Sequence, residues 1–376
     1  MQIGVPKEIK NNEFRVGLSP NSVSELIKFN HKVFIEHGAG IGSGFSDDDY
    51  QKAGAIILNN SDSIFEHAEL IIKVKEPQSC ETSKLKEHHT LFTYLHLAPD
   101  PEQTKQLLLS KACTIAYETV TNIENQLPLL LPMSEIAGRM SIIAGSNCLQ
   151  KSSGGSGILL TGVPGVESAT VVIIGGGVVG SNALQVASGM GARVLILDKD
   201  IQVLRKLEQR FGNKIQTYYA NHTNLIKCLK QADLVVGAVL VAGAAAPKII
   251  SRADLSFMKP RSVIVDVAVD QGGCFESTKP TTHEHPTFIE SNIVHYCVAN
   301  MPGAYPRSAT EALNTATLPY ILELANKGVK QALSKNIHLR NGLHTVKGYL
   351  SNQAVAQAQN IPAITLEKAV SLLDEV

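Results

Sequence analysis

Four ionisable side chains stand where short apolar runs of the sequence end. Lys75 follows LIIKV and His96 follows LFTYL, while Asp270 follows SVIVDVAV and Arg15 lies in the loop after the first apolar run. Arginine binds a carboxylate in a two-pronged pair, lysine polarises a carbonyl oxygen, and histidine exchanges a proton near neutral pH. Asp270 could steer ammonium or water. Together these types suit hydride transfer to and from a small α-keto or α-amino acid, although each one alone also fits an ordinary solvated side chain.

A glycine motif, 175–180 (GGGVVG), stands between the apolar run TVVII and the helix-like segment SNALQVASGM. In this context Gly175 permits the tight turn, Gly177 lets the backbone approach a pyrophosphate, and Gly180 lets the helix pack on the strand. Asp198 ends the next apolar run, where a carboxylate binds the ribose hydroxyls of NAD and repels the 2′-phosphate of NADP. The motif therefore predicts NAD as the cofactor; the alternative is that the glycines only form a turn.

Short Val- and Ile-rich runs alternate with helix-length amphipathic segments along the chain, which is typical of parallel α/β sheets. Helices are predicted to begin at Pro20 after a Ser19 cap and at Pro101, and helical periodicity returns from Ser308. Six strands in the middle of the chain match the number in a complete dinucleotide-binding sheet. The predicted strands are 2–5, 32–36, 70–74, 90–95 and 114–118, followed by 170–174, 193–197, 215–219, 234–239, 262–267 and 294–298.

The composition excludes several classes of protein. The 376 residues are 44% hydrophobic, which is enough for two folded cores, and 34 basic residues balance 34 acidic ones. No global positive field exists for nucleic acid or an anionic membrane. Neither a signal peptide nor a long apolar segment is visible, so we expect a cytoplasmic protein with small-molecule partners.

The remaining polar motifs are expected to have no catalytic role. The six cysteines include no Cys-x-x-Cys pair, and 282–285 (THEH) lacks the helical spacing of a zinc protease, so no metal is predicted. We expect His88 and His89 to lie on a solvated face. The small-residue stretch 154–164 is expected to be a hinge between two domains.

Eight segments of the chain, in order and over essentially its whole length, resemble the alanine dehydrogenase family. They are IGVPKEIKNNEFRVGLSP, IIKVKEP, LFTYLHLAP, LPMSEIAGRM, VPGVESATVVIIGGGVVGSNA, VDVAVDQGGCFE, TTHEHPTF and HYCVANMPGAYPR. The resemblance implies NAD-dependent deamination of L-alanine to pyruvate and ammonium, the reverse reductive amination, and a homohexamer. It implies two doubly wound Rossmann-like domains: an NAD-binding domain, 131–306, inserted into a substrate domain, 1–130 and 307–376, with hydride transfer in the cleft between them.

Residue by residue, the resemblance assigns substrate binding to Arg15 and Lys75 and proton handling to His96 and Asp270. Four positions depart from the pattern of the family. Val203 stands where relatives often carry Lys or Arg, Ala220 where Ser is usual, and Ala244 where Lys is common. Lys279 replaces a frequent Arg. Losing such contacts is expected to weaken NAD binding by about 1–3 kcal/mol. The implied cofactor contacts are Ser134, Gly175, Gly177, Val178, Val179, Gly180, Asp198, Val239, Leu240, Val267, Ala268, Val269, Asp270, Lys279, Val298, Ala299, Asn300 and Met301.

Two related activities are alternatives to this reading. The NAD(H)-binding subunit of a membrane transhydrogenase shares the fold and would pass hydride to a partner protein without a keto-acid substrate. The presence of Arg15, Lys75 and His96 argues against it. A saccharopine-forming enzyme that uses lysine is the second alternative, and the short segments IIKVKEP and TYLHLAP fit alanine dehydrogenase better.

Overall fold

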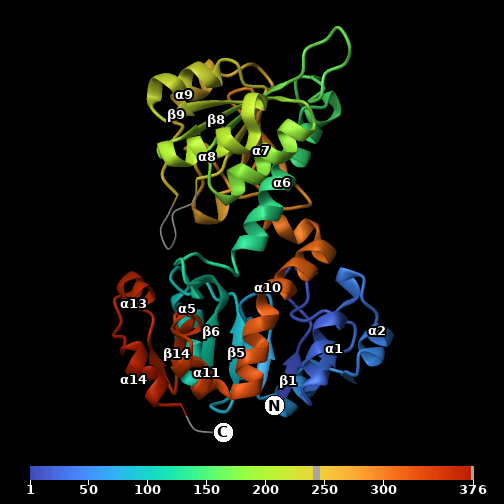
Figure 1. Ribbon diagram of the computed structural model, residues 1–376, viewed down its shortest axis with the longest axis vertical. Helices are drawn as coiled ribbons and strands as arrows, with labels where there is room; N and C mark the ends of the chain where they lie inside the picture. Colours follow the sequence, from blue (N-terminus) through green and yellow to red (C-terminus); the bar gives the residue numbers. More distant parts are fainter. Residues whose placement is uncertain (240–245, 374–376) are drawn as a thin grey trace. The chain divides into compact units, whose positions relative to one another are not determined.

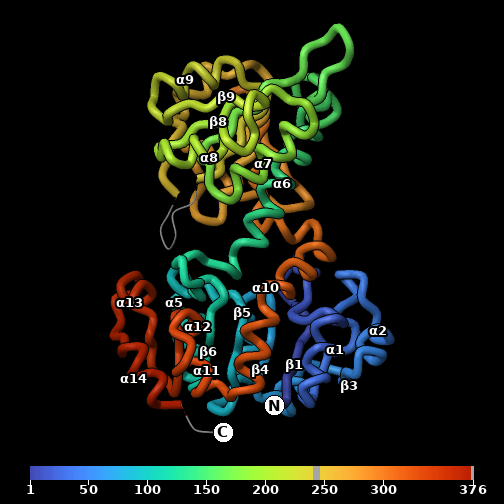
Figure 2. The backbone as a smooth tube through the Cα atoms, in the orientation of Figure 1, coloured from blue at the N-terminus to red at the C-terminus, as the bar shows by residue number. Residues whose placement is uncertain are grey.

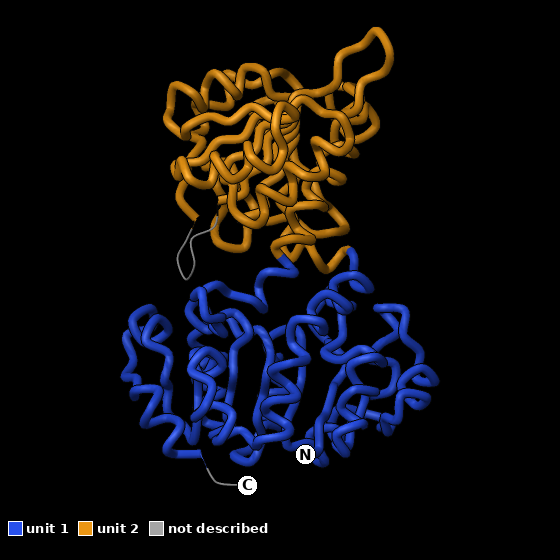
Figure 3. The backbone as a smooth tube through the Cα atoms, in the orientation of Figure 1, with its two compact units in different colours: residues 1–133, 305–376 blue, residues 134–304 orange. Residues whose placement is uncertain are grey.

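The computed structural model describes residues 1–239 and 246–373, and the chain divides into two compact units (Figure 3). Unit 1 comprises residues 1–133 and 305–376, and unit 2 comprises residues 134–304. Each unit contains a mostly parallel sheet with helices, and unit 2 is inserted into the sequence of unit 1, which confirms the predicted fold class. Among the described residues, no helix combines the length and the apolar character that a membrane crossing requires.

Unit 1 contains an eight-stranded sheet in the order β15-β14-β6-β5-β4-β1-β2-β3. The path of the chain through β6, β5, β4 and β1 is labelled in Figure 2. Strands β1 to β6 pair in parallel, whereas β14 runs antiparallel to β6 and β15 runs antiparallel to β14. The strands β1, β4 and β5 are neighbours in this parallel part. The segments that follow them therefore all begin at the same edge of the sheet, that of the carboxyl ends of the strands. The strands are β1 (Gln2–Val5), β2 (Lys32–Glu36), β3 (Ile56–Leu58), β4 (Leu70–Ile72), β5 (Thr90–Thr93), β6 (Cys113–Ala116), β14 (Leu343–Val346) and β15 (Tyr349–Leu350).

The helices of unit 1 begin where the local sequence caps them. The Ser19 side chain accepts the amide of Ser22 ahead of α1, and Asp100 accepts the amide of Gln103 ahead of α5, so the predicted starts at Pro20 and Pro101 are confirmed. The helices are α1 (Pro20–Lys28), α2 (Asp47–Lys52), α3 (Ser61–His67), α4 (Ser79–Thr82), α5 (Pro101–Ser110), α10 (Pro306–Lys327), α11 (Val329–Lys335), α12 (Ile337–Arg340), α13 (Gln353–Gln359) and α14 (Leu366–Ser371), with single 3₁₀ turns η1 (Ile41–Ser43) and η2 (Tyr117–Thr119).

Unit 2 contains a seven-stranded sheet in the order β12-β13-β11-β10-β7-β8-β9. Figure 1 labels β8 and β9 of this sheet together with α6, α7, α8 and α9. The six predicted strands are present. The seventh, β12, pairs antiparallel with β13 through a turn in which Ser291 and Asn292 both have positive φ, which suits a two-residue hairpin. The strands are β7 (Thr170–Ile174), β8 (Arg193–Asp198), β9 (Ile215–Tyr219), β10 (Leu234–Gly237), β11 (Val263–Asp266), β12 (Thr287–Glu290) and β13 (Ile293–Tyr296).

Helices cover both faces of the unit 2 sheet. Val171 and Ile173 of β7 pack in one apolar cluster with residues of α6 and α7, while Val172 and Ile174 pack in a second cluster with residues of α9. Burial on both faces explains why this strand is apolar at every position after Thr170. The helices are α6 (Leu131–Cys148), α7 (Val178–Gly189), α8 (Ile201–Phe211) and α9 (His222–Leu229), with 3₁₀ turns η3 (Lys151–Ser153), η4 (Gly212–Lys214), η5 (Ala253–Phe257), η6 (Val269–Gln271) and η7 (Met301–Ala304).

Two expectations from the sequence are wrong. The stretch 154–164 lies within unit 2, and the unit boundary at Met133 falls inside α6, so this stretch does not join the units. His89 is fully buried: its Nδ1 accepts the amide of Lys86 at 2.9 Å, and its Nε2 lies 2.8 Å from the carbonyl oxygen of Phe65. These two hydrogen bonds offset the cost of burying a polar ring.

Candidate functional site

Arg15, Lys75 and His96 follow β1, β4 and β5, the three adjacent parallel strands of unit 1. The segments after β4 and β5 stay paired beyond the strands, because the amide of Tyr94 donates to Val74 O at 3.2 Å and the hydroxyl of Thr93 donates to Lys75 O at 2.9 Å. The structure therefore brings these three predicted site residues to one edge of the sheet.

Arg15 is held by a carboxylate that the sequence reasoning missed. Its Nε donates to Glu13 Oε1 at 2.7 Å, its Nη2 donates to Glu13 Oε2, and its Nη1 lies 3.1 Å from the sulfur of Met133. Arg15 is 2% exposed and Glu13 5%. Burial alone would raise the pKa of Glu13, but the hydrogen bonds and the charge of Arg15 lower it overall. A signal was available, since Glu13 lies only two residues before Arg15.

The loop that carries Arg15 is fixed from the other end of the chain. Helix α10 supplies buried side chains to it: Thr310 Oγ1 accepts the amide of Val16 at 3.2 Å, and Asn314 Oδ1 accepts the amide of Ser19 at 2.7 Å. Helix α10 therefore supplies hydrogen-bond acceptors for backbone amides next to the candidate site.

The two lysines at the end of β4 have different environments. Lys73 is fully buried, and its ammonium donates to Glu8 at 3.0 Å and to Glu81 at 2.9 Å. Lys75 is half-buried. The second oxygen of Glu8 accepts the amides of Val74 at 2.7 Å and Lys75 at 3.4 Å. Burial raises the pKa of Glu8, and the charge of Lys73 opposes that shift. Lys73 therefore has a structural role, and Lys75 is the lysine suited to a substrate.

The imidazole of His96 is exposed and lies parallel to the ring of Tyr94, with centroids 5.9 Å apart and an interplanar angle of 6°. Tyr94 itself is buried, and its hydroxyl donates to Leu129 O at 2.5 Å. Burial raises the pKa of Tyr94, and the charge of Arg15 opposes that shift. Tyr94 is a second residue that the sequence did not reveal, and it stacks on His96 and feels the charge of Arg15.

The glycine loop of unit 2 connects β7 to α7. A Cβ on Gly175, where φ is +99°, would lie 2.8 Å from Ala238 O, and a Cβ on Gly180 would lie 1.8 Å from Gly175 O. These two glycines are required by the backbone itself. A Cβ on Gly177 would meet nothing within 4 Å, and this residue precedes α7 without a side-chain cap. The helix N-terminus thus presents amides beside open space, which suits a phosphate group.

Asp198 reaches this loop from the end of the neighbouring strand β8. Its Oδ2 accepts the amide of Gly176 at 2.6 Å, and its Oδ1 accepts the amide of Asp200 at 2.8 Å. The carboxylate is therefore fixed beside the glycine loop. Val203 lies against the same glycine, so the position where relatives often have a cation contributes only apolar contact here.

Most of the other predicted cofactor residues of unit 2 follow β10, β11 and β13, which lie on the opposite side of β7 from β8. Val239, the segment 267–270 and the segment 298–301 all lie just beyond these strands. Asn300, where φ is +57°, donates its amide to Asp270 Oδ2 at 3.2 Å, so two of the predicted residues are in direct contact. Val178 and Val179 form the first turn of α7.

Two predicted cofactor contacts, Ser134 and Lys279, do not follow the strands β10, β11 and β13 directly. Ser134 lies in the first turns of α6. Lys279 forms an ion pair with Glu290 of the edge strand β12 at 2.9 Å and lies over the ring of Phe288. Leu240, together with Ala244, lies outside the described residues. Ala220 is packed against the apolar cluster around α9.

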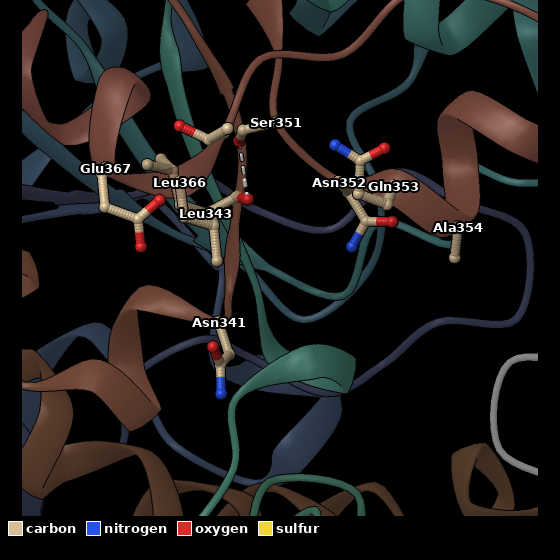
Figure 4. A pocket seen from close by; sticks show the side chains of 9 residues that line it. Asn341, Leu343, Ser351, Asn352, Gln353, Ala354, Leu366 and Glu367 are labelled. Atoms are coloured by element: carbon tan, nitrogen blue, oxygen red, sulfur yellow. Dashed lines mark hydrogen bonds between the residues drawn. The ribbon is translucent and has the colours of Figure 1, made fainter.

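A pocket of about 460 Å³ in unit 1 is unrelated to these residues (Figure 4). The Ser351 hydroxyl at its wall donates to Leu343 O at 2.9 Å. No predicted site residue lines the pocket, so its location gives no support for the predicted chemistry. Its lining comprises Asn341, Leu343, Ser351, Asn352, Gln353, Ala354, Thr365, Leu366 and Glu367.

Comparisons with known proteins cover both units. Residues 4–137 match the family model "Alanine dehydrogenase/PNT, N-terminal domain", and residues 141–353 match "Alanine dehydrogenase/PNT, C-terminal domain". The chain is 53% identical over 372 residues to an alanine dehydrogenase of Methanococcus maripaludis, covering 99% of this chain and 100% of the relative. A solved structure of an L-alanine dehydrogenase matches with a TM-score of 0.93 and 49% identity, covering 96% of this chain and 99% of the other.

A more distant likeness concerns the fold alone. A solved transhydrogenase from Sinorhizobium meliloti matches with a TM-score of 0.79 at 22% identity, covering 94% of this chain and 100% of the other. At this identity the two chains share an architecture, and activity has to be argued from the site.

Proposed function

Because the chain belongs to the alanine dehydrogenase/PNT family, we propose that it interconverts L-alanine and pyruvate with NAD as hydride carrier. In the forward direction, L-alanine, water and NAD⁺ give pyruvate, ammonium, NADH and a proton. The observation that carries the proposal is the set of Arg15, Lys75 and His96 after three adjacent strands, in a chain about half identical to alanine dehydrogenases over nearly its whole length.

We assign substrate binding to unit 1, with the domain limits 1–130 and 307–376. The Nε–Nη2 edge of Arg15 is engaged by Glu13, and its Nη1 lies 3.1 Å from the sulfur of Met133; the guanidinium, held in this way, binds the substrate carboxylate in a charge-assisted pair. Lys75 donates to the keto oxygen and stabilises the charge that grows there. His96, exposed beside Tyr94, exchanges the proton at that oxygen.

We assign cofactor binding to unit 2, with the domain limits 131–306. NAD, when bound, supplies the hydride acceptor, and its reduced form supplies the donor. The space at Gly177 and the uncapped N-terminus of α7 suit the pyrophosphate, and Asp198 suits the ribose hydroxyls. Asp270 steers ammonium or water, and the other predicted contacts after β10, β11 and β13 hold the remainder of the dinucleotide.

The finer assignments follow from family membership. We propose a cytoplasmic homohexamer, and a light-scattering mass of the purified protein would test the number of subunits. The transhydrogenase alternative is supported by a likeness of fold to a protein with 22% sequence identity. The alanine dehydrogenase function is supported by a relative with 53% sequence identity.

The decisive experiment is NADH oxidation by the purified chain. We expect rapid oxidation with pyruvate plus ammonium and little with pyruvate alone, with glyoxylate, or with 2-oxoglutarate plus lysine. Absence of ammonium-dependent turnover would refute the proposed function. Turnover with 2-oxoglutarate and lysine would favour the saccharopine-forming alternative, and NADH binding without any keto-acid reduction would favour a transhydrogenase module.

A further inference from the structure

His96 has a backbone conformation that side chains with a Cβ rarely adopt. Its φ is +50°, in the left-handed region, which is uncommon for residues other than glycine. Such conformations persist only where the surrounding structure over-determines them, and they are frequent at functional sites. The imidazole is exposed, so its own contacts do little to hold the backbone. The groups that bind the neighbouring amides and carbonyls must therefore hold it.

Glu118 binds the amides of this segment. It lies in η2, directly after β6, which pairs in parallel with β5. Its Oε1 accepts the amide of His96 at 2.7 Å, and both of its oxygens accept the amide of Leu95 at 3.2 Å. Hydrogen bonds to an ionised acceptor are about twice as strong as neutral ones, so a half-buried carboxylate is an effective clamp for two successive amides.

Two glutamines bind the carbonyls on either side of His96. Gln103 of α5, itself buried, donates from Nε2 to Leu95 O at 3.2 Å. Gln359 of α13 donates from Nε2 to Leu97 O at 2.6 Å. The segment is thus fixed through amides on one side and carbonyls on the other, and within this set of contacts Glu118 supplies the only ionised group.

We propose that Glu118 is a positioning residue that holds His96 in its left-handed conformation and so sets where the imidazole stands. The inference rests on the proposed function, since it concerns the residue assigned to proton exchange. Both oxygens of Glu118 are engaged by backbone amides, so its role is to orient the histidine and not to transfer the proton.

The buried His344 near Glu118 is hydrogen-bonded to other residues. His344 Nε2 lies 3.1 Å from Thr119 Oγ1 and 3.0 Å from Asn352 Nδ2. Burial lowers the pKa of His344, and the charge of Glu118 opposes that shift. The hydrogen bonds of the Glu118 carboxylate go to the amides of Leu95 and His96.

The first test compares three single variants. Glu118→Ala should lower kcat for pyruvate reduction about 10- to 100-fold, since a displaced catalytic group costs on that order, and should leave the KM for NADH within about twofold. Glu118→Gln keeps an oxygen that can accept the His96 amide and should recover part of the loss. Glu69→Ala is the matched control, because Glu69 accepts the amide of Gln2 at 2.7 Å at the opposite edge of the same sheet. It should leave kcat unchanged.

The second test asks whether Glu118 acts through His96. In a His96→Ala background whose turnover is restored by added imidazole, the further change Glu118→Ala should have less than about a twofold effect, because the side chain that it orients is absent. An equal loss in both backgrounds would overturn the proposal, as would an unchanged kcat in Glu118→Ala. If Glu118→Ala does not fold, Glu118→Gln serves in the same cycle.

Hydrogen exchange provides a readout that does not depend on activity. The amides of Leu95 and His96 should exchange slowly in the unmutated chain and become fast in Glu118→Ala, while the strand amides of β5 keep their protection. Fast exchange in the unmutated chain would overturn the clamp. Absence of ammonium-dependent turnover in the unmutated chain would instead refute the proposed function, so the two failures are distinguishable.

Discussion

The carboxylate of Glu13 occupies the Nε–Nη2 edge of Arg15, two residues further along the chain. Both side chains are buried, and the amide of Arg15 donates to the same carboxylate at 3.0 Å. Arg15 therefore enters the candidate site with one edge of its guanidinium already paired, which fixes the orientation of the other edge. A lysine in its place would lose this geometry, because an ammonium has no planar fork.

Removing Glu13 should destabilise the chain strongly. Glu13→Ala leaves a buried guanidinium without its carboxylate, and the free energy of unfolding should fall by about 3–5 kcal/mol. Equilibrium urea unfolding measures this. Glu311→Ala is the control, because it removes one partner of the exposed Arg307–Glu311 pair, and it should cost less than about 1 kcal/mol. If Glu13→Ala lowered the free energy of unfolding by as little as the control Glu311→Ala, the prediction would be contradicted.

Two glycines of the β7–α7 loop should respond differently to the same change. Gly177→Ala places a methyl group in open space, so the unfolding free energy should change by less than about 1 kcal/mol while the NADH dissociation constant rises at least about 10-fold. Gly180→Ala drives a Cβ into Gly175 O and should destabilise unit 2. Fluorescence titration with NADH and thermal unfolding separate the two effects. Unchanged NADH affinity in Gly177→Ala would contradict the cofactor assignment.

Asp198 should control the choice between NAD and NADP. Asp198→Ala removes the carboxylate that repels a 2′-phosphate and the acceptor for the Gly176 amide, so the KM for NAD should rise about 10-fold and the preference over NADP should narrow. The ratio of kcat/KM values for the two cofactors measures this. Asp200→Ala, which removes only the cap of α8, should leave that ratio unchanged. An unaltered ratio in Asp198→Ala would show that another group discriminates.

His89 should make the fold sensitive to mild acid. Burial, together with the charge of His88, lowers its pKa from 6.5 to about 4. The unfolded chain therefore binds the proton more readily, and stability should fall as the pH drops from 6.5 towards 4. The expected loss between pH 7 and pH 5 is about 2 kcal/mol.

A variant without a titratable group isolates this effect. His89→Gln can still accept the Lys86 amide and donate to Phe65 O, so its stability should change less between pH 7 and pH 5. The exposed neighbour His88 gives the control variant His88→Gln, which should keep most of the pH dependence. Equal slopes in all three proteins, measured by urea unfolding at each pH, would contradict the role of His89.

Part of the fold could be predicted, because a strand that is buried on both faces consists mostly of apolar residues. The strand β7 is apolar on both faces and was predicted with its observed limits. The strand β14 is also buried, but its interior contains the polar residues His344 and Thr345, and the hydroxyl of Thr345 is hydrogen-bonded to that of Thr114 at 2.8 Å. A buried strand whose polar groups are paired with residues more than 200 positions away has no apolar run to reveal it.

The candidate site shows the same division. The shared edge of Arg15, Lys75 and His96 could be predicted, because residues after parallel strands lie at one edge of a sheet, whereas their roles stay predictions. Glu118 could not, because its importance depends on which backbone amides the neighbouring strand brings to it. Local sequence also misled for His89, since the charged residues around it suggest a solvated helix, whereas the observed turn directs the ring inward.

The antiparallel strand β14 borders β6, β15 borders β14, and α10 holds the loop of Arg15, yet all three lie in the final quarter of the sequence. When all residues of unit 2 have been synthesised, the C-terminal segments that complete unit 1 have not yet been synthesised. Until then the outer side of β6 has no neighbour, and newly made molecules risk pairing with one another along it.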